Sequence, residues 1–145
     1  MYQKNERERE DYFLEQEEAL LKGGVAFSEW CTFISKSVYD AFVSGADLAT
    51  VITAVACIEA YFRTESMHTG KMNLATLIDK ESFLSEEEKS QLHELRRYRN
   101  RWVHLHELDD SDILKDEDKY LKEAEQMSFL AVKLLLTILF SCPFI

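Results

Sequence analysis

The segment from Phe129 to Phe140 constrains the fold most, because it is apolar nearly all the way round a helix. Such a helix either crosses a membrane or is packed on most of its sides by other elements. The run is shorter than the roughly 20 apolar residues that a membrane span needs, and Lys133 interrupts it. We therefore expect a helix over about 119–142 at the centre of a helical bundle, partly buried by a second subunit.

Apolar residues recur at helical spacing in the rest of the chain as well. The chain contains one Pro and four Gly in 145 residues, and 46% of it is hydrophobic, so a loop-rich or disordered chain is not expected. The pattern predicts further helices over about 4–22, 26–43, 48–65 and 74–78, and one that begins near Glu86. The sequence thus predicts one all-α domain over 1–145, an antiparallel helical bundle of about five to six helices.

Local signals mark where several of these helices begin and end. Gly45 is expected to end one helix, and Asp47 is expected to cap the next one. Asn73 is the expected cap of the short helix. Ser85 and Glu88 have the spacing of a capping box, in which each side chain bonds the backbone N–H of the other residue.

The apolar residues of segment 26–43 include several aromatic side chains. Their spacing is typical of a core-facing stripe, so we interpret them as core rather than as a base-stacking surface. The predicted stripe consists of Phe27, Trp30, Ile34, Val38 and Phe42.

The three cysteines, Cys31, Cys57 and Cys142, are odd in number and lie far apart in apolar patterns. They are expected to be buried thiols in a reducing compartment rather than disulfide or zinc ligands. The N-terminal segment begins with charged residues and lacks the apolar core of a signal peptide. We therefore expect a cytoplasmic protein without membrane association.

The net charge of −10 is unevenly distributed along the chain. Residues 1–18 hold three basic and seven acidic groups, and residues 107–118 hold one basic and seven acidic groups. The acidic and basic run from Glu6 to Asp11 is expected to form a solvated helical face. Residues 92–106, in contrast, carry four Arg and one Glu. This local basic site is compatible with a ligand that carries a phosphate.

One arginine in this basic segment lies close to the middle of an apolar helical stripe. The stripe is formed by Leu92, Leu95, Trp102 and Val103. Arg99 falls between them, and Glu59 falls on the apolar stripe of segment 48–65. An unpaired buried charge costs several kcal/mol, so Arg99 and Glu59 are expected to meet in a salt bridge. Such a pair can be a structural salt bridge, and it can orient Arg99 toward a phosphate; we weigh these two interpretations evenly, and they do not exclude each other.

Arg99, Asn100 and His104 together suit the cleavage of RNA. RNA supplies its own nucleophile, the 2′-hydroxyl, so the protein needs only to move protons and stabilise the phosphorane. An imidazole titrates near neutral pH, and a guanidinium offers forked donors to phosphate oxygens. A metal site built from His93, His104, His106 and Asp109 is not expected, because their spacings do not place them on one face.

The sequence Arg99-Asn100-Arg101-Trp102-Val103-His104 resembles the arginine–histidine motif of the HEPN superfamily. This resemblance implies a HEPN-like bundle and a metal-independent endoribonuclease, often a toxin or an anti-phage defence effector, without a cofactor. It implies His104 as general acid or base and Arg99 and Asn100 on the scissile phosphate. It also implies a site built across a homodimer and an antitoxin or other regulatory protein as a partner. The residues expected to support the site are Glu59, Arg96, Arg101 and His106.

Two other functions remain open on sequence grounds. One is a non-catalytic HEPN-like module that binds a nucleotide or a partner protein. The other is a plain helical dimerisation domain in which the pair of Glu59 and Arg99 is only structural.

Overall fold

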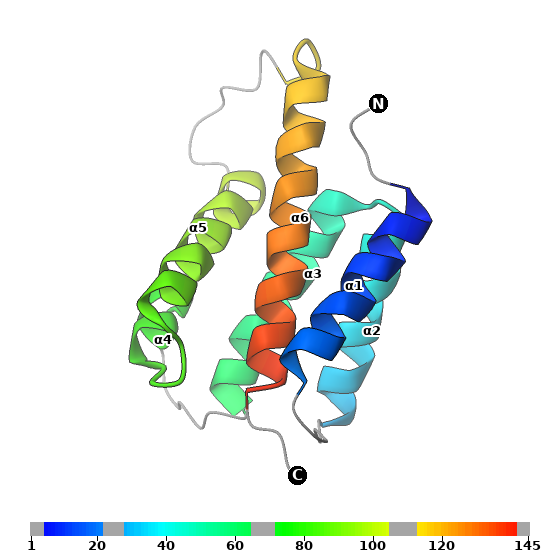
Figure 1. The fold of residues 1–145 in the computed structure, drawn as a ribbon. Helices are drawn as coiled ribbons and strands as arrows, with labels where there is room; N and C mark the ends of the chain where they lie inside the picture. Colours follow the sequence, from blue (N-terminus) through cyan, green and yellow to red (C-terminus); the bar gives the residue numbers. More distant parts are fainter. Residues whose placement is uncertain (1–4, 22–27, 65–71, 105–112, 142–145) are drawn as a thin grey trace.

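The protein is described by a computed structural model that covers residues 5–21, 28–64, 72–104 and 113–141. The regular secondary structure in these ranges is entirely α-helical: α1 Glu6–Leu20, α2 Glu29–Val43, α3 Asp47–Thr64, α4 Leu74–Lys80, α5 Glu86–Val103 and α6 Glu117–Leu139. The predicted all-α bundle is therefore confirmed. Consecutive long helices alternate in direction, so α1, α3 and α6 run parallel to one another and antiparallel to α2 and α5 (Figure 1).

Helix α6 occupies the centre of the bundle, as predicted. It packs against α1, α2, α3 and α5, and its contact with α3 is the most extensive in the molecule. The side chains of Ala131, Val132 and Ile138 are completely buried, whereas Lys133 is exposed. The apolar surface on most sides of this helix is thus covered by other helices of the same chain. Within the described residues, no helix is both long enough and apolar enough to cross a membrane.

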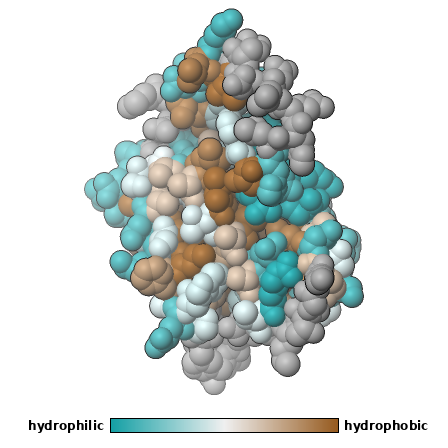
Figure 2. Space-filling model, turned by 180° about the vertical axis from the view of Figure 1, so that it is seen from behind, coloured by the Kyte–Doolittle hydropathy of each residue, from teal (hydrophilic) through white to brown (hydrophobic). Residues whose placement is uncertain are grey.

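The outer face of α3 lies on the side of this helix opposite α6 (Figures 1 and 2). This face carries Ala49 and Ala56, which are exposed, and Ile52 and Ala60, which are half-buried. Figure 2, which views the molecule from that side, shows hydrophobic and weakly polar groups along the middle and hydrophilic groups on both flanks. A narrow surface of small and apolar side chains is therefore open to solvent here.

The core side of α2 differs in part from the predicted stripe. Val38 and Phe42 are completely buried, but Trp30 is 50% exposed, so its assignment to the core is wrong. Cys31, one residue further along, is buried instead, because the inward face of the first turn lies about 100° away from Trp30. Phe27 lies outside the described residues.

Two cysteine thiols lie in contact in the interior, between α2 and α3. Cys31 and Cys57 are both buried and not disulfide-bonded, as predicted. The hydrogen bond to Cys31, together with burial, raises the pKa of the Cys57 thiol far above its ordinary value. The Cys57 thiol is therefore held in the neutral, unreactive form. Cys142 lies outside the described residues.

Local signals correctly placed three of the helix ends. Ser85 Oγ accepts from the Glu88 backbone N–H at 3.1 Å, and Glu88 Oε1 accepts from the Ser85 N–H at 2.8 Å, which completes the capping box. Asn73 Oδ1 accepts from the Thr76 N–H at 2.9 Å and caps α4. Gly45 follows α2 with a φ of +84°, the left-handed conformation that glycine adopts without strain.

A cluster of buried charged groups joins α1, α3 and α6. Arg9 is completely buried, and its guanidinium donates to Asp47 at 2.6 and 3.2 Å and to Glu125 Oε2 at 3.2 Å. It also donates to the Phe42 carbonyl at 2.9 Å, and Ser128 Oγ donates to Asp47 Oδ1 at 2.8 Å. Each charge in this interior therefore has a partner of opposite sign, which offsets the cost of removing it from water.

This cluster corrects two predictions. The run from Glu6 to Asp11 is not entirely a solvated face, because Arg9 points inward and lies 5.3–5.4 Å from the centres of the Phe42 and Phe129 rings. Asp47 is not the cap of α3, since it is the first helical residue and its carboxylate contacts Arg9. A buried cation offers this carboxylate a stronger, charge-assisted partner than a backbone N–H does.

Candidate functional site

The buried stripe of α5 is shifted from the one that the sequence predicts. Leu92, Leu95 and Tyr98 are buried and Trp102 is half-buried, whereas Val103 is 40% exposed. Tyr98 thus takes the central position in the stripe. Its neighbour Arg99 is half-buried at the edge, where its charged end does not have to enter the core.

Arg99 and Asn100 form a pair of their own. The Arg99 Nε donates to Asn100 Oδ1 at 2.8 Å, and both side chains are half-buried. Glu59 instead lies 3.9 Å from Arg63, one turn further along α3. The predicted salt bridge between Glu59 and Arg99 is therefore wrong, because Arg99 is less deeply buried than expected and each group has a partner on its own helix. Among the described residues, neither terminal nitrogen of Arg99 pairs with a carboxylate.

His104 lies where α5 ends. The helix is regular through Val103, and His104 leaves it with φ −123° and ψ 83° while its backbone N–H still donates to the Asn100 carbonyl at 2.9 Å. The change of chain direction thus comes at His104. His104, which carries the imidazole, is exposed and lies one helical turn beyond Asn100. The sequence-predicted residue His106 lies outside the described residues.

The two supporting arginines differ in their surroundings. Arg96 is half-buried, and its Nε is shielded from solvent without a hydrogen-bond acceptor among the described residues. Arg101 faces α6, where its Nη2 contacts Glu123 Oε1 at 3.0 Å and its guanidinium lies 5.6 Å from the centre of the Tyr98 ring. The structure therefore does not bring Arg101 into contact with the pair of Arg99 and Asn100.

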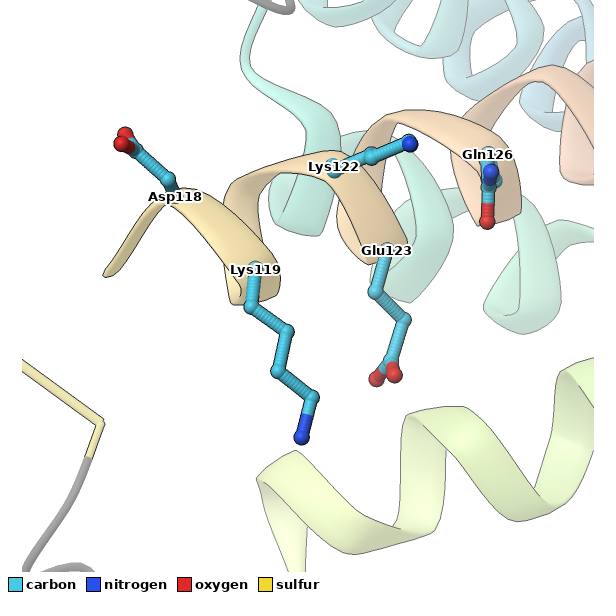
Figure 3. Close-up of a pocket in the computed structure, with 5 residues that line it drawn as sticks. All are labelled: Asp118, Lys119, Lys122, Glu123 and Gln126. Atoms are coloured by element: carbon cyan, nitrogen blue, oxygen red, sulfur yellow. The ribbon is translucent and has the colours of Figure 1, made fainter. Parts of the chain in front are cut away.

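A shallow cavity of about 490 Å³ lies beside this contact, on the first turns of α6. Figure 3 shows Lys119 and Glu123 pointing toward α5, whereas Asp118 and Lys122 extend away from it. The charged groups that line the cavity are two acids and two bases, and Gln126 completes the lining. These charges balance, so nothing in this cavity favours an anion such as a phosphate.

A second cavity, of about 470 Å³, is lined by Trp102 and is called the Trp102 pocket here. It is formed where the end of α5 meets the start of α6 and the turn between α2 and α3. Its lining residues are Gly45, Ala46, Asp47, Leu48, Ala49, Tyr98, Trp102, Ile113, Leu114, Glu117, Tyr120, Leu121 and Ala124. The Trp102 ring lies 6.4 Å from the Tyr98 ring and 6.2 Å from the Tyr120 ring, both edge to face.

The Tyr98 hydroxyl is an unusual group in this pocket. Its oxygen is shielded from solvent, and among the described residues no acceptor takes a hydrogen bond from it. Burial raises the pKa of Tyr98, and the indole N–H of Trp102, which faces the same oxygen, partly offsets this effect. Because the indole N–H is itself a donor, the Tyr98 O–H has no acceptor among the described residues.

The pocket was not predicted from the sequence, because its walls come from segments far apart in the chain. One signal was present in the sequence, since Tyr98 and Trp102 lie four residues apart and therefore share a helix face. The contribution of Tyr120 and of the turn at Gly45 depends on tertiary packing alone.

His93 joins α5 to α4 and is not directed at the motif. Its Nε2 lies 2.8 Å from Asp79 Oδ1, and this contact links the two helices. In the described part of the chain, no group of three His, Cys, Asp or Glu side chains is close enough to hold a metal ion. His106 and Asp109, two members of the metal site weighed from the sequence, lie outside the described residues.

Comparison with known proteins identified no relative of this chain. The chain matches no protein-family model, and it has no significant match to a curated protein or to a solved structure. The function must therefore be argued from the residues themselves.

Proposed function

We propose that this protein is a metal-independent endoribonuclease of HEPN type that acts as a toxin or an anti-phage defence effector. Arg99 and Asn100 bind the scissile phosphate, and His104 moves the protons. The motif resemblance suggests the reaction, and the bond between Arg99 and Asn100 is the single observation that supports it most strongly.

This bond supports the proposal because it holds a guanidinium in one orientation without neutralising it. Asn100 is uncharged, so the positive charge of Arg99 remains available to an anion. With Nε engaged, the two terminal nitrogens present parallel N–H groups, the geometry that recognises two phosphate oxygens. A purely structural arginine is typically paired with a carboxylate, as Arg9 is in this chain.

The proposed reaction is an internal transfer on the RNA strand. The 2′-oxygen loses its proton to a base and attacks the adjacent phosphorus, while the bond from phosphorus to the 5′-oxygen breaks. A proton from an acid then reaches the leaving 5′-oxygen. The products are a 2′,3′-cyclic phosphate and a 5′-hydroxyl, and the guanidinium of Arg99 stabilises the charge that builds up on the phosphorane oxygens.

The need for both a base and an acid favours a homodimer with a composite site. Two copies of His104, one from each protomer, would divide these roles in a single turnover. The small and apolar outer face of α3 supports self-association, because packing against a second copy would remove Ile52 and the nearby alanines from water. An antitoxin or other regulatory protein would restrain such an enzyme in the cytoplasm.

The deciding experiment is a cleavage assay on total cellular RNA with excess chelator, using wild type and the His104→Ala and Arg99→Ala variants. We expect cyclic-phosphate ends from wild type only. Arg97→Ala is the matched control, since Arg97 is an exposed arginine on the same helix and lies outside the proposed site. Cleavage that persists in His104→Ala, or that requires a divalent metal, would contradict the proposal.

The alternative is a non-catalytic HEPN-like module that binds a nucleotide or a partner protein. The Trp102 pocket favours it, because an apolar cavity of this size suits a small ligand. This alternative predicts no RNA cleavage by folded wild-type protein, together with thermal stabilisation by a nucleotide.

A further inference from the structure

We propose that the Trp102 pocket binds a purine base and prefers guanine. Its volume of about 470 Å³ falls within the range of about 300–1,000 Å³ that is typical of small-molecule sites. The lining is mostly apolar, and the three aromatic rings meet edge to face rather than stacking on one another. Trp102 and Tyr120 are half-buried, so part of each ring is open for a planar ligand to stack against, an interaction that every nucleobase offers.

The Tyr98 hydroxyl has no acceptor among the described residues, so it favours a ligand that carries a hydrogen-bond acceptor. Tyr98 is 5% exposed, so this donor has been removed from water without compensation from the described residues. A buried donor that lacks an acceptor is costly, and a ligand oxygen that reaches this hydroxyl, once the half-buried Trp102 ring turns aside, would remove this cost. A small rotation of the half-buried Trp102 ring would bring its N–H to the same acceptor.

Two acidic residues line the pocket, but only one of them is available to a ligand. The carboxylate of Asp47 is already bound by Arg9 and Ser128. Glu117, the first residue of α6, is exposed and lines the same pocket. A carboxylate pairs with two adjacent N–H donors, and guanine presents such donors on one edge and a carbonyl acceptor beside them. Adenine lacks this edge, so the combination of Tyr98 and Glu117 favours guanine.

The negative charge of Glu117 disfavours a phosphate in the pocket, whereas the positive charge of Arg99 attracts one. An anion would be repelled by Glu117, whereas a neutral base is not. Trp102 lies three residues after Arg99 and two before His104, so a base in the pocket belongs to a nucleotide close to the motif. This placement beside the scissile phosphate rests on the proposed function, but binding of the base does not.

Fluorescence of Trp102 tests the inference directly. The chain has two tryptophans, and Trp30→Phe removes the other one at an exposed position. In this background we expect guanosine to quench the emission in a saturable manner, adenosine to bind more weakly and uridine to bind most weakly. Guanosine carries no phosphate and no scissile bond, so the outcome is independent of whether the protein cleaves RNA.

The Glu117→Gln variant tests the preference for guanine, with Asp118→Asn as the matched control. Loss of a bidentate contact should weaken guanosine binding about 10-fold while leaving adenosine unchanged. Asp118 is the next residue of α6 and lines only the other cavity, so its variant should bind guanosine as wild type does. The inference is overturned if guanosine does not quench Trp102, if uridine binds equally well, or if the two variants behave alike.

Discussion

Replacement of Arg9 by methionine should destabilise the protein strongly. Methionine keeps an unbranched chain in the interior but leaves the carboxylates of Asp47 and Glu125 without the cation that both contact. Removing one partner from a buried ion pair costs about 3–5 kcal/mol. Both carboxylates lose their contact with the cation here, so we expect a loss of at least about 4 kcal/mol, a large share of the about 5–15 kcal/mol that stabilises a native domain.

Urea unfolding followed by circular dichroism measures this effect. With a slope of about 2 kcal/mol per molar urea, the midpoint of Arg9→Met should fall by about 2 M. Arg7→Met is the control, because Arg7 is exposed on the same helix and its loss should change stability by less than about 0.5 kcal/mol. Adding Asp47→Asn and Glu125→Gln to Arg9→Met should restore part of the loss, because neutral amides need no cation. Equal midpoints for Arg9→Met and Arg7→Met would refute the reasoning.

Three smaller changes test the local structure. Ser85→Ala removes the capping-box bond to the Glu88 N–H and should cost about 1 kcal/mol in urea unfolding, whereas Ser90→Ala on the exposed side of the same helix should not. Gly45→Ala meets no neighbour within 4 Å, so backbone strain at φ +84° alone should lower the melting temperature by about 2–4 °C, and an unchanged value would contradict this. Burial raises the pKa of Tyr98 above 10.0, so its contribution to stability is complete below pH 10 and is lost as the pH rises through the raised pKa. Tyr98→Phe should therefore show a smaller fall in urea midpoint between pH 9 and 11 than wild type.

The features that could be predicted from the sequence depend on residues close together in the chain. The capping box joins residues three apart, and the cap of α4 does the same with Asn73 and Thr76. The turn at Gly45 needs only a residue that tolerates a positive φ. Such signals require no knowledge of which helices pack together, and for this reason they predicted helix ends correctly.

The buried role of Arg9 was missed although a signal for it was present. Arg9 lies on the same helix stripe as Phe13 and Leu20, four and eleven residues later. The same argument singled out Arg99 on its own stripe. In the first helix, acidic residues flank Arg9 in the sequence, so its place on an apolar stripe was overlooked. The carboxylates that offset the cost of burying Arg9 come from α3 and α6, and this packing is not visible in the sequence.

The error at Arg99 came from the phase of the apolar stripe. Including Val103 and leaving out Tyr98 rotates the mean direction of the stripe by about 35°, which is enough to move Arg99 from its edge to its centre. Tyrosine has an apolar body and a polar tip, and a sequence does not tell which part the fold will bury. In this structure the whole side chain is buried, and Arg99 consequently keeps its charged end toward the surface.

Stability and the proposed chemistry are therefore carried by different parts of the molecule. The buried charge cluster around Arg9 joins α1, α3 and α6, whereas Arg99, Asn100 and His104 lie at the end of α5. His104 is exposed and Arg99 is bonded only to its uncharged neighbour Asn100 among the described residues, so truncating either side chain opens no large cavity, and truncating Arg99 breaks no ion pair with a described residue. A loss of RNA cleavage in these variants at an unchanged urea midpoint would thus report on the reaction itself. A loss accompanied by a midpoint shift as large as that of Arg9→Met would instead assign Arg99 a structural role.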